Sequence, residues 1–205
     1  MKNALATILI AALAGANAGT ALADELDWTV KVGAHEVDPK SNNGSLAGGA
    51  LQAEVGSNAR PTITGEYLFA PGWGIEALAA IPFEHDVKLN GVKAATVKHL
   101  PPTVSVQYHF NANGTVSPFV GVGLNYTTFF SEHTTGPLTG TKLDLNDTFG
   151  PTVHAGIDFR INERWLFALD ARWIDISPDA KVNGQKVGTV HIDPFVYGFS
   201  FGYRF

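Results

Sequence analysis

Histidine, serine and carboxylate side chains are the groups in this chain that could do chemistry, since it has seven histidines and no cysteine. A hydrolase needs a nucleophile, a base and an orienting acid within hydrogen-bond reach of one another. The alternation of side chains places His109 and His154 on the inward faces of predicted strands, together with Ser105 and Asp158. Those faces fill a packed interior that no substrate reaches. We therefore do not expect an enzyme.

A second candidate group is Glu84-His85-Asp86, with Lys98 and His99 at the same predicted rim. Carboxylates and imidazoles of this kind bind divalent cations, and the cations bind lipopolysaccharide phosphates. The spacing matches no established ligand pattern, and charged residues in a solvated loop commonly bind nothing specific. We assign no metal and no cofactor to the chain. A lysine series at most indicates a surface that faces lipopolysaccharide: Lys88, Lys93 and Lys98.

Residues 1–23 have the pattern of a cleaved secretory signal peptide. Lys2 precedes a short apolar run, and Ala21-Leu22-Ala23 forms a cleavage site before Asp24. A membrane anchor is the alternative, because the apolar stretch approaches the roughly 20 residues that span a bilayer. The formal net charge of −5 becomes more negative once Lys2 is removed, which argues against nucleic acid as a partner.

The elements that must position the inward residues are eight segments in which apolar and polar residues alternate. Tilted strands of about 9–11 residues cross a membrane in this pattern. Long polar connections alternate with tight turns, as in barrels with extracellular loops and periplasmic turns. The prediction is an all-β, eight-stranded antiparallel transmembrane β-barrel of residues 24–205 in a bacterial outer membrane. The segments are Leu26–Asp38, Thr62–Phe69, Trp73–Phe83, Thr96–Phe110, Ser117–Phe130, Phe149–Arg160, Arg164–Ile176 and His191–Phe205.

The last segment is an aromatic stripe. From Phe195 to Phe205 every second residue is Phe or Tyr, with small or polar residues between them. A strand with lipid on one side has this composition, whereas a soluble sandwich or lipocalin-like barrel would have to bury all the rings. We predict that Tyr203 and Phe205 form the signal that the barrel assembly machinery recognises.

The predicted lumen mixes charges of both signs with apolar residues. Eight strands enclose an interior that only side chains or one small ligand can fill, so bulk ion or sugar flow is not expected. The apolar members either line a solute path or fill space, and an inward Arg172 beside Asp170 argues against a fully hydrophobic channel. The lumen residues are Leu68, Glu76, Leu78, Gln107, His109, His154, Asp158, Leu166, Asp170 and Arg172.

Two consecutive prolines, Pro101 and Pro102, interrupt the fourth segment. Proline donates no ladder hydrogen bond and is normally excluded from central strands. The pair therefore either leaves a gap in the wall that faces lipid, or only ends regular pairing near the rim as a bulge. The residue pattern does not distinguish these alternatives.

Several motifs are distinctive as a set: Ala79–Phe83, His99-Leu100-Pro101-Pro102-Thr103, Pro118–Phe130 with its Asn-Tyr-Thr-Thr-Phe-Phe run, Trp173–Ile176 and the ending from Asp193 to Phe205. Together they resemble the OmpW family of small outer-membrane porins. The resemblance covers almost the whole mature chain. It implies a barrel that passes small hydrophobic molecules across the outer membrane, with a lateral opening near the proline pair and outer-membrane lipids as its surroundings. The alternative is a barrel whose loops serve as a receptor for phages, bacteriocins or host factors.

Overall fold

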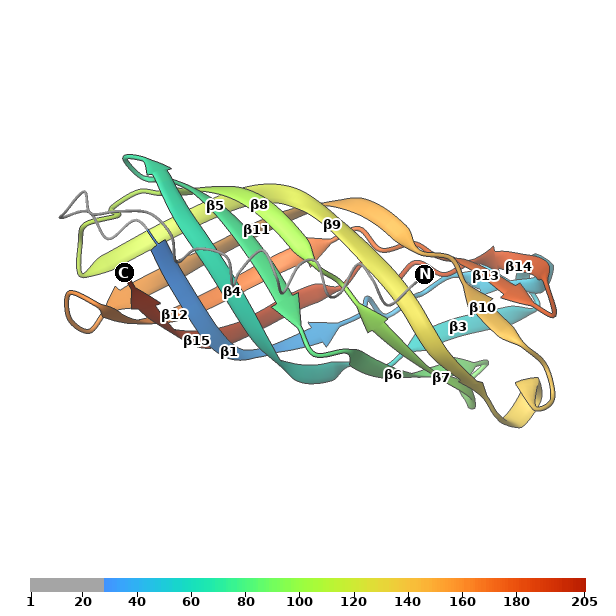
Figure 1. The fold of residues 1–205 in the computed structure, drawn as a ribbon. Coiled ribbons are helices and arrows are strands. Elements are labelled where there is room, and N and C mark those ends of the chain that lie inside the picture. Colours follow the sequence, from blue (N-terminus) through green and yellow to red (C-terminus); the bar gives the residue numbers. More distant parts are fainter. Residues whose placement is uncertain (1–27) are drawn as a thin grey trace, which may run out of the picture.

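Residues 28–205 are described in a computed structural model and form a closed antiparallel barrel (Figure 1). Each wall strand pairs with the wall strand that follows it in the sequence, and the pairing between β9 and β11 closes the barrel. The predicted fold of eight antiparallel strands is confirmed, whereas the predicted signal peptide lies outside the described residues. The wall strands are β1 (Trp28–Asp38), β4 (Asn58–Ala70), β5 (Trp73–Ala80), β8 (Thr103–His109), β9 (Val116–Thr134), β11 (Thr148–Arg160), β12 (Trp165–Ile174) and β15 (Phe195–Arg204).

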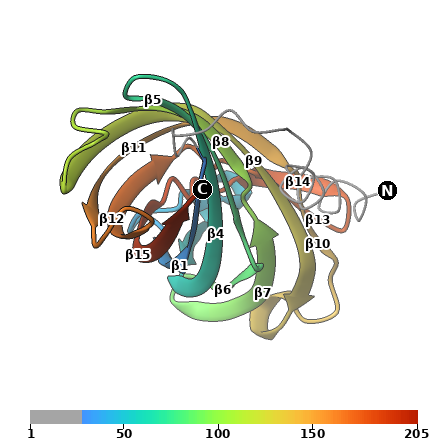
Figure 2. The same ribbon diagram turned by 60° about the vertical axis from the view of Figure 1, so that its left-hand side comes forward.

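The long connections fold into an extension at one end of the barrel, on the right in Figure 1. They pair with one another, and β10, β13 and β14 make a separate three-stranded sheet. Figure 2 shows the barrel from a second direction. Within residues 28–205 no helix has the length and apolar character to span a membrane. The elements of the extension are β2 (Ser45–Leu46), η1 (Ala47–Gly49), β3 (Leu51–Val55), β6 (Phe83–Leu89), β7 (Val92–Leu100), η2 (Gly136–Leu138), β10 (Leu143–Leu145), β13 (Asp179–Val182) and β14 (Gln185–Thr189).

The outer surface of the barrel is apolar, as a lipid-facing wall requires. Along β9, Val120, Val122 and Leu124 are 46%, 64% and 54% exposed, whereas the residues between them face inward. Aromatic pairs mark the end with the tight turns. Trp73 packs on Tyr108 and Trp165 on Tyr203, each pair with ring centroids 5.0 Å apart. Such girdles sit at the interface between membrane and water.

Glycine makes room inside the narrow barrel. A Cβ at Gly121 would overlap the imidazole of His154 on the paired strand β11. A Cβ at Gly33 would overlap the backbone carbonyl of Phe199 across the β1–β15 pair. Both inward positions need glycine, because the side chains that fill the interior of an eight-stranded barrel leave no space there for a Cβ.

Candidate functional site

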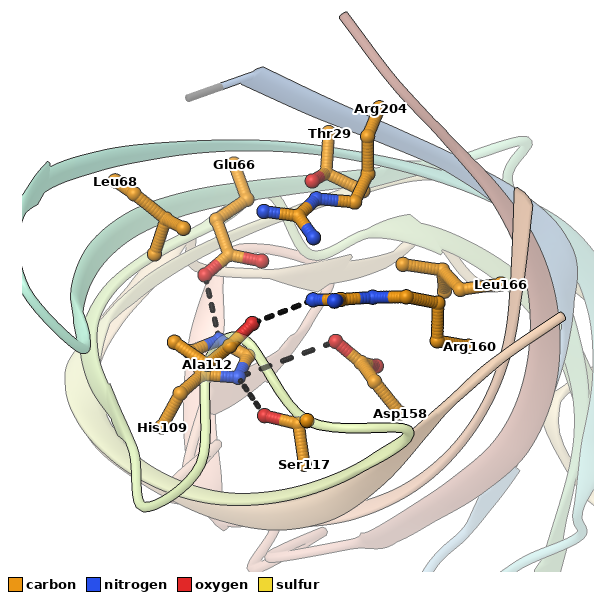
Figure 3. A pocket seen from close by; sticks show the side chains of 11 residues that line it. Thr29, Glu66, Leu68, His109, Ala112, Ser117, Asp158, Arg160, Leu166 and Arg204 are labelled. Carbon is orange, nitrogen blue, oxygen red and sulfur yellow. Dashed lines mark hydrogen bonds and ion pairs between the residues drawn. The ribbon is translucent and has the colours of Figure 1, made fainter. Parts of the chain in front are cut away.

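The barrel interior near the tight turns is filled by a buried ionic cluster (Figure 3). Lys31 Nζ lies 2.9 Å from Asp158 Oδ1 and 3.7 Å from Glu66 Oε2. His109 joins the cluster through Nε2, which is 2.7 Å from Glu66 Oε1. Buried charges are tolerated when partners and hydrogen bonds compensate them, and loss of one partner from such a pair typically costs about 3–5 kcal/mol.

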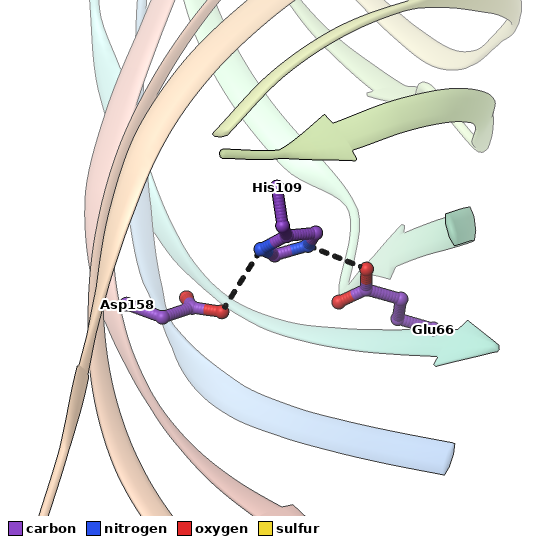
Figure 4. Close-up of side chains that lie close together, drawn as sticks. All are labelled: Glu66, His109 and Asp158. Carbon is purple, nitrogen blue, oxygen red and sulfur yellow. Dashed lines mark hydrogen bonds and ion pairs between the residues drawn. The ribbon is translucent and has the colours of Figure 1, made fainter. Parts of the chain in front are cut away.

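Three members of this cluster have donor atoms that a metal ion could use. Glu66, His109 and Asp158 offer atoms within 4.8 Å of one another (Figure 4). One imidazole and two carboxylates are suitable ligands for zinc. However, the Lys31 ammonium already contacts both carboxylates and supplies the positive charge that they need. The cluster is therefore a set of internal ion pairs, and it does not support a metal site.

The same cluster resembles a catalytic triad in its distances. His109 Nδ1 lies 3.1 Å from Ser117 Oγ, and its Nε2 lies 2.7 Å from Glu66. The adjoining cavity has a volume of about 20 Å³, which is room for about one water molecule. No substrate carbonyl can approach Ser117 in that space. The arrangement therefore does not support an acyl-transfer site.

A second ionic layer lies farther along the barrel. Arg172 Nη2 is 3.1 Å from Glu76 Oε1 and 3.3 Å from Asp170 Oδ2, so the pairing anticipated between Arg172 and Asp170 is present. His35 Nε2 completes the layer at 2.8 Å from Asp170 Oδ1. The Arg172–Glu76 pair crosses the lumen, because β12 and β5 lie on opposite sides of the barrel, whereas Asp170 is on the same strand as Arg172. Together with the cluster around Lys31, these ion pairs occupy the route that a solute would need to cross toward the tight turns.

The ten predicted lumen residues all lie on the inner face of the wall. Leu68 and Leu166 line the small polar cavity beside the Lys31 cluster and are not part of a continuous apolar path. Ile174, the last residue of β12, belongs to the apolar core of the extension. The inner-face set is Leu68, Glu76, Leu78, Gln107, His109, His154, Asp158, Leu166, Asp170 and Arg172.

A larger hollow lies in the extension. It has a volume of about 190 Å³, and two histidines are its only lining residues that are not Ala, Val, Leu, Ile or Phe. A cavity of about 150 Å³ with such a lining stays dry and holds benzene. The lining residues are Leu46, Ala47, Leu51, Val55, His85, Val87, Leu89, Val97, His99, Phe129, Leu138, Leu143, Leu145, Ala180, Val182, Val187, Val190 and Ile192.

This cavity was missed by reasoning from the sequence, which treated the long connections as polar. The signal that could have revealed it is short alternation inside those connections, such as Leu143-Asp144-Leu145 on β10 and Leu51, Ala53 and Val55 on β3. Each segment places its apolar residues on one face. The faces meet only when four connections from different parts of the chain come together.

The predicted rim cluster around Glu84 and His85 is divided between two faces, which corrects the expectation that its members lie together. The carboxylates face outward, where Lys98 Nζ lies 3.2 Å from Glu84 and Lys93 Nζ lies 2.7 Å from Asp86. His85 is 3% exposed and lines the cavity instead. The reason is the period of two along β6. Because the outer face of β6 is charged, this part of the wall stands beyond the lipid.

The two cavity histidines form a parallel stack. His85 and His99 have ring centroids 4.9 Å apart and an interplanar angle of 7°, and Phe83 and Phe129 pack beside His99. Burial lowers the pKa of His85, and burial together with the neighbouring His85 ring lowers the pKa of His99 well below its usual value. Both imidazoles are therefore neutral at pH 7. The Nδ1 of His85 contacts the carbonyl oxygen of Gly56, so Nδ1 carries the proton.

The wall beside this stack is interrupted. Pairing of β5 with β8 ends at Leu78 and Thr103, and pairing of β6 with β7 begins at Phe83 and His99. Within the described residues no ladder pair joins residues 79–82 to residues 100–102. The expected strands Trp73–Phe83 and Thr96–Phe110 are therefore each interrupted, the first between β5 and β6 and the second between β7 and β8. The Pro101–Pro102 pair lies in this unpaired stretch.

The hydrogen bonds beside the interruption point away from it. Asn125 Nδ2 donates to the carbonyl oxygens of Pro101 and Pro102 at 3.0 and 3.1 Å, and Tyr126 N donates to Pro102 at 3.0 Å. On the other side, Ile81 N donates to Pro61 O on β4 at 3.3 Å. One edge therefore bonds to β9 and the other to β4, which leaves the two edges unpaired with each other.

Comparison with known proteins agrees with this architecture. The model of the OmpW family matches residues 24–205. Outer membrane protein W of Salmonella typhi is 36% identical over 208 residues, which cover 97% of this chain and 98% of that protein. The crystal structure of OprG from Pseudomonas aeruginosa superposes with a TM-score of 0.78 at 34% identity and covers 87% of this chain and 95% of OprG.

A more distant curated relative is the dibenzothiophene metabolism operon protein DoxH of Pseudomonas sp. (strain C18). It is 26% identical and covers 89% of this chain and 90% of its own length. The matches span the barrel together with its extension, which places the protein in the bacterial outer membrane. On this evidence the chain belongs to the OmpW family.

Proposed function

We propose that the protein takes up small hydrophobic molecules from outside the cell and releases them sideways into the outer membrane. The observation that carries the proposal is an apolar cavity of about 190 Å³ set above a barrel filled with ion pairs. A molecule that prefers the cavity to water cannot continue along the axis without displacing Arg172 or Lys31 from their carboxylates. The exit that avoids this cost leads through the wall.

The interruption at Pro101 and Pro102 supplies that exit in our proposal. His99 lines the cavity, and its cross-strand partner Phe83 is the first paired residue beyond the interruption. The Phe83–His99 pair, whose ring centroids are 5.5 Å apart, therefore lies between the cavity and the unpaired stretch. Opening there breaks no ladder hydrogen bond, because the flanking backbone groups bond to β9 and β4.

The name of DoxH supports the proposed class of solute. That relative is described as a protein of a dibenzothiophene metabolism operon, and dibenzothiophene is an apolar aromatic molecule. Uptake of such molecules by this chain is our proposal. Contacts with lipopolysaccharide, and recognition of Tyr203 and Phe205 by the barrel assembly machinery, stay predictions.

The test measures uptake of labelled p-xylene by cells that express the protein and by cells with an empty vector. The variant Pro101→Val/Pro102→Thr restores two amide donors and two strand-forming side chains, which favours closure of the ladder. We expect its uptake to fall toward the empty-vector level while heat-modifiable gel mobility shows a folded barrel. Pro118→Val is the matched control, because Pro118 lies within a paired stretch of β9 and β11.

Two results would contradict the proposal in different ways. Unchanged uptake by the double variant would remove the lateral exit but keep the transport role. Equal uptake by the wild type and the empty vector would remove the transport role and leave the receptor barrel as the better account.

A further inference from the structure

The stacked histidines are the one polar feature in the lining of the apolar cavity, and His99 is the less satisfied of the two. His99 is 2% exposed, and its Nε2 has no hydrogen-bond partner among residues 28–205. Within the described residues no hydrogen bond is formed by its Nδ1 either. The ring is held only by packing against Phe83, His85 and Phe129.

An unpaired buried polar group is unfavourable, and nearly all such groups in proteins have a partner. The cavity side chains other than His85 are all apolar, so the described chain offers His99 no nearby polar side chain as a substitute. His85 cannot serve, because the two rings stack in parallel with centroids 4.9 Å apart, and an N–H that lies in the plane of one ring does not point at a nitrogen of the other. The missing partner must come from what enters the cavity.

We propose that His99, with His85 beside it, is a hydrogen-bonding subsite that selects hydrophobic molecules carrying one hydroxyl group, namely phenols and apolar alcohols. The inference rests on the proposed function and names its ligand class. A neutral imidazole has one N–H donor and one bare acceptor, and a hydroxyl group can satisfy either. His99 lines the cavity, and among residues 28–205 neither of its ring nitrogens has a hydrogen-bond partner, so both are available to a hydroxyl group. The unpaired His85 Nε2 offers a second acceptor one ring away.

The size of the cavity sets the size of the ligand. A volume of about 190 Å³ fits a benzene ring with one or two small substituents, given that about 150 Å³ holds benzene. p-Cresol and p-xylene form a matched pair, because they differ only by a hydroxyl group in place of a methyl group. Their shapes and ring currents are nearly the same. Any difference in their binding therefore reports the hydrogen bond.

The experiment measures the affinities of p-cresol and p-xylene for the purified barrel in nanodiscs, each corrected for partition into protein-free nanodiscs. After that correction we expect p-cresol to bind about three- to tenfold more tightly, as one net hydrogen bond predicts. The variant His99→Phe keeps an aromatic ring for the stack but has no nitrogen. In this variant the ratio of affinities should fall to about one.

Val187→Ala is the control variant, since the shorter side chain enlarges the cavity without changing the polar atoms that line it. It should change the affinity of both compounds and leave their ratio as in the wild type. If His99→Phe does not fold, a measurement of ring nitrogen resonances on the wild type alone still tests the proposal. The ring nitrogen resonances of ¹⁵N-labelled His99 should shift with p-cresol and stay nearly unchanged with p-xylene.

The outcomes separate this inference from the proposed function. Binding of p-xylene with no preference for p-cresol, or a preference that persists in His99→Phe, overturns the subsite and leaves hydrophobic uptake standing. Failure of both compounds to bind overturns the subsite and also argues against the cavity as part of an uptake route.

Discussion

At the scale of single residues, the barrel interior and the cavity use histidine in opposite ways. His109 in the barrel interior contacts Glu66, Ser117 and Gln107, so its ring nitrogens are fully engaged. His99 in the cavity has no hydrogen bond to any residue that the structure describes, and it stacks on aromatic neighbours. The first arrangement builds a rigid plug, whereas the second leaves a polar group available to a ligand.

The cavity histidines should make stability depend on pH. Their folded pKa values lie below the unfolded value of about 6.5, so the stabilisation is complete above that pH and is lost as pH falls toward the folded values. The charged group that acts on the pair is Arg60, which also disfavours protonation of His85. Below pH 6.5 each histidine should lower the free energy of unfolding by about 1.4 kcal/mol per pH unit.

Urea unfolding in detergent micelles between pH 8 and pH 5 measures this slope. His99→Phe should remove the part of the slope that belongs to one imidazole, and exposed His133→Phe serves as the control that leaves it in place. Equal slopes for the wild type and His99→Phe would show that His99 does not remain neutral in the folded protein.

Sequence reasoning was most informative for residues inside regular strands. The period of two placed Glu76, His109 and His154 on the inner face, where the structure also has them. It erred at His85 and His99, which were grouped with Glu84 and Asp86 at a solvated rim. Their positions depend on a wall that continues beyond the membrane, and nothing local in the Glu84-His85-Asp86 motif shows that continuation.

At the scale of elements, the barrel and the extension differ in how far the sequence reveals them. The wall strands are long and each carries its own alternating pattern, so their number follows from the chain alone. The strands of the extension are as short as the two residues of β2 and the three of β10. Their pairing is set by contacts between distant connections. Such contacts have no periodic signature that a reader of the sequence could recognise.

The β13–β14 hairpin should be separable from the barrel. It pairs only with β10 among the described strands, yet Ala180, Val182 and Val187 form part of the cavity wall. Asp179 and Thr189 are directly paired, so a two-residue Asn-Gly turn can replace residues 180–188. Loss of this apolar surface should weaken p-xylene binding by about tenfold or more.

Heat-modifiable gel mobility should show that the shortened protein still folds into a barrel, and nanodisc binding measures the affinity. Gln185→Ala, on the exposed face of the same hairpin, is the control that should bind as the wild type does. Wild-type affinity in the shortened protein would mean that the hairpin is not part of the binding wall.

At the scale of the whole molecule, the direction of the barrel in the membrane decides what the cavity can receive. Figure 1 shows the tight turns at one end of the barrel and the extension at the other. The aromatic girdle and the Lys31 cluster lie at the end with the tight turns, and the cavity lies in the charged extension. Outer-membrane barrels keep short turns in the periplasm and long loops outside. The cavity therefore faces the medium, and the ionic plug lies between it and the periplasm.

Single cysteines test this orientation cleanly, because the natural chain contains no cysteine. Gln185→Cys lies on the exposed hairpin of the extension, and Glu163→Cys lies in the exposed turn between β11 and β12. A membrane-impermeant maleimide should label Gln185→Cys in intact cells and Glu163→Cys only after the outer membrane is permeabilised. The reverse pattern would put the ionic plug at the cell surface and the cavity in the periplasm. Solutes would then meet Lys31 and its carboxylates before any apolar surface, and entry from outside into the cavity would have no physical basis.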